Sequence, residues 1–165
     1  MFKRAQILTS CYVSFSHGAN DVANAAGPIA AVMIVASTGE IPRTVEIPFL
    51  ALAVGGIGIS MGVFFLGQKV METVGEKITT LTNSRGFTVD FSTATTVLLA
   101  SSLGLPISTT HVVVGAVTGV GLARGLEVVN VGILKNIVIS WFLIVPTVAA
   151  TSAGVYSILK LVLKF

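Results

Sequence analysis

Long apolar stretches separated by short polar ones run along the whole chain. Residues 5–37, 47–67 and 136–159 each hold about 20 or more mainly apolar residues, the length that a helix needs to cross a bilayer. Residues 38–46 are a polar turn. Residues 68–90 hold six charged side chains, which favours a cytoplasmic loop with some helix. The pattern therefore predicts three spans, the first of them broken near Gly18.

Residues 91–123 have a different pattern. They are apolar enough for the membrane, but Gly104-Leu105-Pro106 interrupts the run and leaves halves of about 13–17 residues, too short to span. A re-entrant helical hairpin with its tip at residues 104–108 explains both observations. Non-helical backbone is tolerated at membrane depth only inside protein or beside a water-filled cavity, so such a tip is a candidate functional element.

The basic residues give an orientation. If the hairpin enters and leaves on one side, seven of the ten basic residues share that side and three lie opposite. The first group is Lys3, Arg4, Lys69, Lys77, Arg85, Arg124 and Lys135, and the second is Arg43, Lys160 and Lys164. The positive-inside rule then places the amino terminus and the hairpin mouth in the cytoplasm.

Composition supports a membrane protein. Charged residues make up 10% of the chain and hydrophobic residues 53%, and the mean hydropathy is +0.93. Soluble domains carry about 25% charged residues, so we expect one all-α, multi-pass unit in the cell membrane, surrounded by lipid. A basic patch with interleaved aromatic residues is absent from the sequence, which argues against nucleic acid as a partner.

The first candidate site is the stretch His17-Gly18-Ala19-Asn20-Asp21-Val22-Ala23-Asn24-Ala25. On a helix, the side chains of His17, Asn20, Asp21 and Asn24 fall within an arc of about 100°. An ionisable group at membrane depth is expensive and indicates an ion or substrate site. The alternative is a polar clamp between helices, which could explain an asparagine but does not readily explain Asp21.

The second candidate site is the hairpin tip, Pro106-Ile107-Ser108-Thr109-Thr110-His111. Ser108 is a plausible N-cap, and the first amides of the half-helix that follows have no intrahelical partner. An anion fits such a helix start, and the hydroxyls of Ser108, Thr109 and Thr110 suit a tetrahedral oxyanion. Ser101 and Ser102 lie on the facing arm. The alternative is that these hydroxyls only cap a helix and bond to nearby carbonyls.

A broken helix with a carboxylate and a hairpin with a hydroxyl-lined helix start together suggest a site for a cation and an anion. Direct contact between Asp21 and an anion would be repulsive, so Asp21 is assigned to the cation. Neither a nucleophile–base pair nor a set of metal ligands is recognisable in the sequence, so an enzyme is not expected and no cofactor is predicted.

The two stretches resemble the two signature motifs of the PiT (PHO-4) inorganic phosphate transporters, and residues 84–87 resemble microbial members. The resemblance covers nearly the whole chain. It implies a secondary transporter that couples phosphate uptake to sodium or protons, with sodium as a co-substrate. It makes Ser108, Thr109 and Thr110 phosphate contacts and Asn20, Asp21 and Asn24 ion-binding residues, with sodium at Asp21 and Asn24.

One departure from the family pattern stands out. Family members contain two inverted repeats, each with both motifs, whereas this chain has one copy of each motif and resembles the second, C-terminal repeat. It would then supply half of a site, completed by an N-terminal repeat half or by a second copy of this chain. A symporter of another oxyanion, such as sulfate or arsenate, and a non-transporting membrane assembly module remain the alternative functions.

Overall fold

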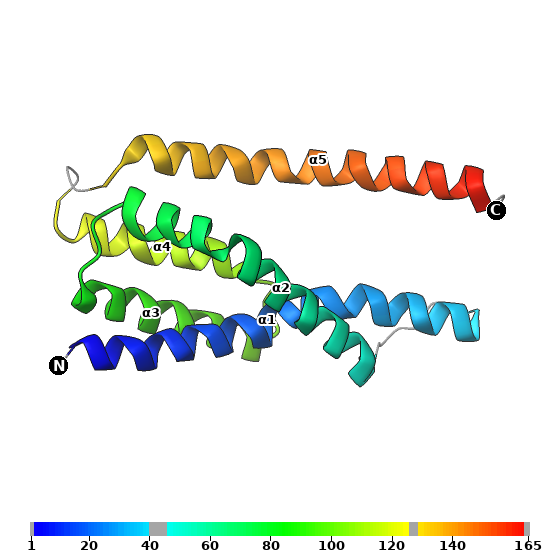
Figure 1. The fold of residues 1–165 in the computed structure, drawn as a ribbon, viewed down its shortest axis with the longest axis horizontal. Coiled ribbons are helices and arrows are strands. Elements are labelled where there is room, and N and C mark those ends of the chain that lie inside the picture. The colour runs from blue at the N-terminus through cyan, green and yellow to red at the C-terminus, as the bar shows by residue number, and fades with distance from the viewer. Residues whose placement is uncertain (1, 40–45, 126–128, 164–165) are drawn as a thin grey trace. The chain divides into compact units, whose positions relative to one another are not determined.

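The computed structural model describes residues 2–39, 46–125 and 129–163, and within these ranges the chain is helical and has no strand. The helices are α1 (Phe2–Thr38), α2 (Phe49–Glu72), the π-helical turn η1 (Thr73–Lys77), α3 (Asn83–Ser102), α4 (Thr109–Leu122) and α5 (Val131–Leu163) (Figure 1). Of the described helices, three are long and apolar enough to cross a membrane: Lys3–Thr38, Phe49–Lys77 and Val131–Val162. The predicted all-α membrane fold is confirmed, and these three helices correspond to the three predicted spans.

The prediction of a broken first helix is wrong. Helix α1 runs from Phe2 to Thr38 without interruption and includes both Gly18 and Pro28. A glycine inside a helix costs about 1 kcal/mol relative to alanine, which packing of the neighbouring turns can offset. Ser16, one turn before Asn20, is buried to 1% exposure, and its hydroxyl donates to the Tyr12 carbonyl at 2.8 Å.

Small residues bring α1 and α2 close together. Ala26 and Ala30 of α1 are fully buried against Ala51 of α2. At Gly55 of α2, an added Cβ would lie 3.6 Å from the Val22 carbonyl oxygen, so the two backbones nearly touch. Such close approach is typical of helices that associate in membranes.

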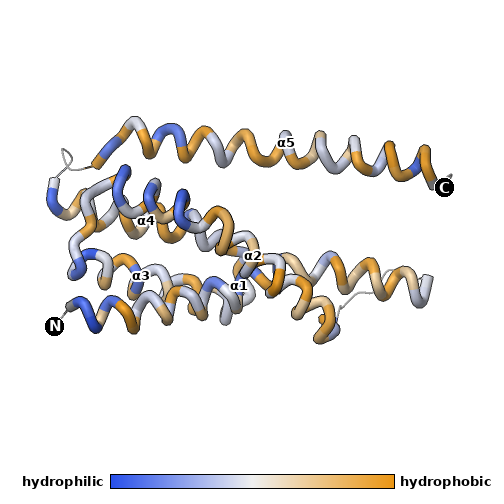
Figure 2. Tube along the Cα trace, in the orientation of Figure 1, coloured by the Kyte–Doolittle hydropathy of each residue, from blue (hydrophilic) through white to orange (hydrophobic). Residues whose placement is uncertain are grey.

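The predicted loop 68–90 is mostly helical. Its beginning continues α2 and η1, and its end forms the first turns of α3, so that residues 78–82 alone connect them. Five of the six charged side chains that suggest a loop lie at helix ends, where water can reach them, whereas Asp90 lies inside α3. Figure 2 shows hydrophilic residues at the end of α2 and at the starts of α1 and α3. Arg85 donates from Nη1 to the Thr80 carbonyl at 2.5 Å and ties the connector to α3.

Helices α3 and α4 pack against each other as an antiparallel hairpin that lies along the N-terminal half of α1 (Figure 1). The hairpin begins at Asn83 rather than at residue 91, and its tip comprises residues 103–108. Val89, Ala94 and Val97 of α3 are buried in this packing. The depth of the tip in a membrane stays a prediction, as does the cytoplasmic side of the hairpin mouth.

Helix α5 belongs to a unit of its own, separate from the unit that contains α1 to α4. It includes the predicted span 136–159 and continues through Pro146. Its apolar side chains are largely exposed, among them Phe142, Val145 and Leu161. Lipid or further protein must cover such a surface.

Candidate functional site

The turn between α3 and α4 is built by local sequence. Gly104 has a φ of +69°, a left-handed conformation that glycine adopts without strain. The Leu105 amide donates to the Ala100 carbonyl at 2.9 Å and the Gly104 amide to the Ser101 carbonyl at 3.1 Å. These two bonds form a Schellman motif, which satisfies the last carbonyls of α3. The tip is therefore an ordered structure that holds the start of α4 in place.

Ser108 caps helix α4, as the sequence predicts. Its Oγ accepts a hydrogen bond from the His111 amide at 3.4 Å, and its backbone is extended, with φ −98° and ψ 115°. Pro106 lies two residues before the cap and cannot take part in a continuing α3 ladder. Helix α4 thus begins beside the middle of α1, where the first motif lies.

Asn20 joins α1 to both arms of the hairpin. Its Oδ1 accepts a hydrogen bond from Ser101 Oγ of α3 at 2.9 Å. Its Nδ2 donates to Asp21 Oδ1 at 2.6 Å and lies 3.3 Å from the Ile107 carbonyl oxygen and 3.4 Å from Thr109 Oγ1. We call this set of contacts the Asn20 clasp. It brings together residues separated by more than 80 positions in the chain.

The partners of Asn20 leave one orientation for its amide group. A carboxylate and a backbone carbonyl can only accept hydrogen bonds, so the side facing Asp21 and Ile107 must be the donating nitrogen. The hydroxyl of Ser101 can donate, and it lies next to the amide oxygen. Each side of the amide therefore meets a group of the complementary kind, and a flipped amide would face two acceptors.

Asp21 lies at the centre of the site. Its Oδ1 accepts from Asn20 and, at 3.2 Å, from the hydroxyl of Thr109, the first residue of α4. Its Oδ2 lies 2.7 Å from Nδ1 of His17, one turn earlier on α1. The side chain is 28% exposed, so a small ion can still reach it.

The other predicted residues lie near this centre but do not join it. Thr109 is buried to 6% exposure, whereas Ser108 and Thr110 are exposed at the start of α4. Asn24 is exposed one turn, about 6 Å, beyond Asn20 on α1, and no hydrogen bond within the described ranges ties it to the clasp. Of the six predicted site residues, Asn20, Asp21 and Thr109 are therefore in mutual contact.

Two contributors go beyond the predicted set. The sequence places Ser101 and Ser102 on the facing arm, but Ser101 alone bonds to Asn20, while Ser102 bonds to the Leu98 carbonyl at 2.7 Å. The Ile107 carbonyl is a backbone group that no residue pattern reveals. Because α1 is continuous at Gly18, the carbonyls at that point keep their hydrogen bonds within the helix. The Ile107 carbonyl belongs to no helix and lies 3.3 Å from Asn20 Nδ2.

The sequence does not reveal a second polar contact between α1 and α3, because the charge pattern predicts a loop at Asp90. Asp90 Oδ2 accepts from Ser10 Oγ at 2.7 Å and from Thr9 Oγ1 at 3.4 Å. The contact lies about three turns from Asp21, towards the amino terminus of α1. Among the residues that the structure describes, no three His, Cys, Asp or Glu side chains gather as they would around a transition metal.

A hairpin tip that carries a helix start onto a half-buried carboxylate in a helical membrane fold is an arrangement typical of substrate sites in membrane transport proteins. Comparison with known proteins agrees. The family model described as "Phosphate transporter family" matches residues 1–152. The chain therefore belongs to the phosphate transporter family, which confirms the resemblance seen in the two motifs.

Relatives and a solved structure point the same way. The chain is 60% identical over 162 residues to a protein of Thermococcus kodakarensis titled "Putative phosphate permease", and it covers 40% of that relative. It is 42% identical over 163 residues to "Sodium-dependent phosphate transporter 1" of Felis catus, of which it covers 24%. A solved structure titled "The sodium-dependent phosphate transporter" superposes with a TM-score of 0.86 at 91% identity; the match covers 97% of this chain and 40% of the solved one.

Proposed function

We propose that this chain supplies one half of a site that carries inorganic phosphate across a membrane together with a cation, sodium or a proton. The observation that carries the proposal is the hydrogen bond from Thr109 to Asp21, 3.2 Å long, which joins the start of α4 to the carboxylate of α1. An anion-binding element and a cation-binding element thus touch. The titles of the relatives, which name phosphate and sodium, support the same pairing.

The phosphate half of the proposal rests on α4. Its first amides point out of the helix start, and the helix dipole adds positive potential there. Ser108 uses its oxygen to accept from the His111 amide, so its hydroxyl hydrogen can be donated to a ligand. Thr110 is exposed one residue into the helix. Phosphate held there would accept hydrogen bonds from Ser108, Thr110 and the adjacent amides, and from Thr109 once a cation at Asp21 frees its single hydroxyl hydrogen.

The cation half rests on Asp21. Phosphate carries between one and two negative charges near neutral pH, so it would repel a bare carboxylate within contact distance. A sodium ion or proton at Asp21 removes that repulsion, and the repulsion itself links the binding of the two substrates. Asn24, one turn further along α1, and the Ile107 carbonyl, 3.3 Å from Asn20 Nδ2, would add oxygen ligands to sodium, while Asn20 holds the carboxylate in place.

The chain spans about 40% of the length of the archaeal permease and of the solved transporter. We propose that the rest of the site comes from a second repeat of opposite orientation. That repeat is either another part of the same polypeptide, a separate chain or a second copy of this one.

The decisive experiment is isothermal titration of the assembled transporter with phosphate, in the presence and absence of sodium, for the wild type and Asp21→Asn. We expect sodium to tighten phosphate binding in the wild type and to have little effect in Asp21→Asn. Glu72→Gln is the matched control, because it removes an exposed carboxylate at the end of α2 and should behave as the wild type.

Sodium-linked binding that survives in Asp21→Asn would remove Asp21 from the coupling role. Phosphate binding with no sodium linkage in the wild type, across a range of pH, would favour a non-transporting assembly module. Repeating the titration with sulfate and arsenate tests the alternative substrates, because neutral donors alone do not separate tetrahedral anions strongly.

A further inference from the structure

A row of polar side chains runs along one face of α1, from its amino-terminal end to the candidate site. On an ideal helix these side chains fall within an arc of about 80° and recur at the helical spacing of three or four residues. The row, which we call the polar stripe, consists of Lys3, Gln6, Ser10, Ser14, His17 and Asp21. It covers about 27 Å of helix, since each residue adds about 1.5 Å.

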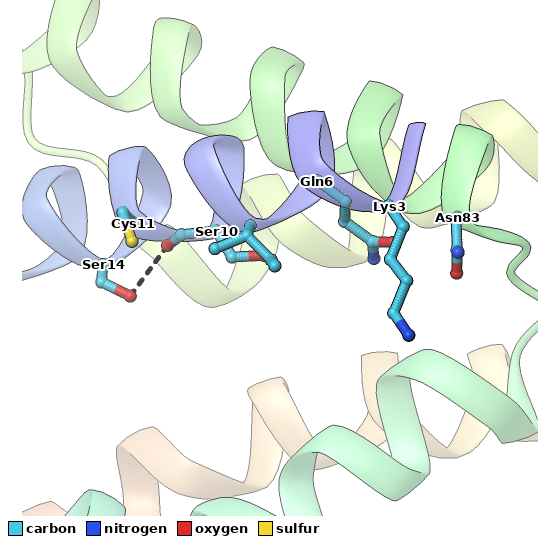
Figure 3. A pocket seen from close by; sticks show the side chains of 7 residues that line it. Lys3, Gln6, Ser10, Cys11, Ser14 and Asn83 are labelled. Carbon is cyan, nitrogen blue, oxygen red and sulfur yellow. Dashed lines mark hydrogen bonds between the residues drawn. The ribbon is translucent and has the colours of Figure 1, made fainter. Parts of the chain in front are cut away.

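The polar stripe is partly open in the unit that contains it: Ser10 Oγ donates to Asp90 Oδ2 of α3 at 2.7 Å and Gln6 packs against Gly86 of α3, but the rest of the face is accessible. Lys3, Ser10 and Ser14 are exposed, and the His17 side chain is 37% exposed. The first part of the stripe forms one wall of an open groove of about 420 Å³ (Figure 3). Cys11, beside the stripe, also lines this groove.

The stripe ends at the site. Beyond Asn24, the same face of α1 continues with Pro28, Val32 and Val35, all exposed and all apolar. The polar surface therefore leads from the amino-terminal end of the helix to Asp21 and Asn24 and no further. This asymmetry is not expected of a helix that uses polar residues only for packing along its length.

The opposite face of the same turns is apolar. Leu8 is 73% exposed and Phe15 is 68% exposed, about half a turn away from the polar stripe. A helix segment standing in water would not expose large apolar side chains in this way, and one surrounded by lipid would not expose a row of polar ones. The two faces therefore require two surroundings, an apolar one for Leu8 and Phe15 and a wet one for the stripe.

We propose that the polar stripe is the wall of a water-filled half-path that connects Asp21 to the aqueous phase at the amino-terminal end of α1. Phosphate and its cation enter or leave along it. Lys3 at the mouth attracts the anion and the Gln6 amide can donate to it. The hydroxyl oxygens of Ser10 and Ser14, whose hydrogens go to Asp90 and to the Ser10 carbonyl, can accept from water or coordinate the cation. The apolar continuation past Asn24 closes the route on the other side. The inference rests on the proposed function, because it takes the site at Asp21 as the end of the path.

Thiol labelling in the assembled transporter tests the half-path. A charged, membrane-impermeant thiol reagent is added to either side of sealed vesicles that contain the transporter. The first sample is the wild type, whose Cys11 lines the groove, and the second is Ser14→Cys in a Cys11→Ser background. Phe15→Cys, on the apolar face, and Val32→Cys, past the site, are matched controls in the same background. Thiols react as thiolates, which form in water and not in apolar surroundings, so we expect labelling about tenfold or more faster at the stripe than at the controls.

The half-path predicts labelling of Cys11 and Ser14→Cys from one side of the membrane only, the side that holds the start of α1. Labelling no faster than in the controls would show that the stripe is buried against other protein, and labelling from both sides would exclude a half-path. Phosphate titration of the same variants before labelling separates the two ideas. Sodium-linked phosphate binding without stripe labelling overturns the half-path alone, whereas stripe labelling without such binding overturns the proposed function alone.

Discussion

Replacing Asn20 by aspartate is a sharp test of the site, because it changes one atom type and almost no volume. In the wild type, Asn20 Nδ2 donates to Asp21 Oδ1 at 2.6 Å and faces the Ile107 carbonyl oxygen at 3.3 Å. Asn20→Asp puts a charged acceptor in that place. The donor of the clasp is lost, and two carboxylates are forced together.

The 2.6 Å separation sets the size of the effect. Two unit charges at that distance repel by about 1.6 kcal/mol in water and by about 6 kcal/mol at an effective dielectric constant of about 20. Since about 1.4 kcal/mol corresponds to a factor of ten, the smaller value already predicts a loss of about 15-fold in the population of the intact site. At the larger value, the pair takes up a proton instead, because two adjacent carboxylates cannot both stay ionised. One shared proton restores a donor between the two side chains.

Phosphate uptake into vesicles, measured at fixed sodium concentration over a range of pH, tests this reasoning. We expect Asn20→Asp to lose most of its uptake at neutral pH and to regain part of it as the pH falls. Asn20→Ala, which removes the donor without adding charge, should lose activity with no recovery in acid. Uptake by Asn20→Asp within about threefold of the wild type from acid to alkaline pH would refute the reasoning, since neither the repulsion nor its relief by a shared proton would then be visible.

Three further substitutions test the packing around the site. Gly55→Leu, at the close contact of α2 with α1, should lower the thermal stability of the purified transporter by about 1–3 kcal/mol through overpacking. Gly58→Leu should not, because the space around its Cβ is open. Equal effects of the two substitutions would contradict a close contact between α1 and α2 at Gly55. Ser108→Ala removes the side chain that caps α4, an interaction worth about 1 kcal/mol. Hydrogen exchange at the His111 amide, which donates to the Ser108 hydroxyl, should become about fivefold faster. An unchanged exchange rate would contradict the capping role. Thr109→Val should destabilise the docked hairpin by about 1.5–3 kcal/mol, measured by thermal unfolding, because it loses the hydroxyl that donates to the Asp21 carboxylate. Thr109→Ser keeps that hydroxyl and should retain most of the stability. A loss in Thr109→Ser without a loss in Thr109→Val would assign the effect to the methyl group instead.

The elements that sequence predicts well are those decided by local chemistry. Span length follows from hydropathy, and the hairpin turn follows from Gly104 and Pro106, because few residues can close one helix and open the next. The N-cap at Ser108 follows from the same kind of rule, a hydroxyl before a helix start. None of these requires knowledge of a distant partner.

The elements that sequence misses depend on packing. Gly18 carries a local penalty of only about 1 kcal/mol, so tertiary contacts decide whether the helix continues, and here it does. The charged stretch around Glu72 resembles a loop in composition but lies at helix ends. Asn20 rather than Asn24, and Ser101 rather than Ser102, forms the contact between α1 and α3. Which residue does so depends on how each helix is rotated and on its position along its axis to within about one turn, and one sequence specifies neither.

The contact between α1 and α2 differs in kind from the Asn20 clasp. It consists of alanine methyl groups and glycine, with Ala26 and Ala30 one turn apart on one helix and Ala51 and Gly55 one turn apart on the other. Such a surface has shallow ridges, and a shift of one turn replaces a small residue by another small residue. Its register is therefore weakly specified, whereas the clasp fixes α1 to the hairpin through directional bonds. A sliding movement within this half of the fold would meet least resistance between α2 and the rest, leaving the carboxylate and the helix start together as one body.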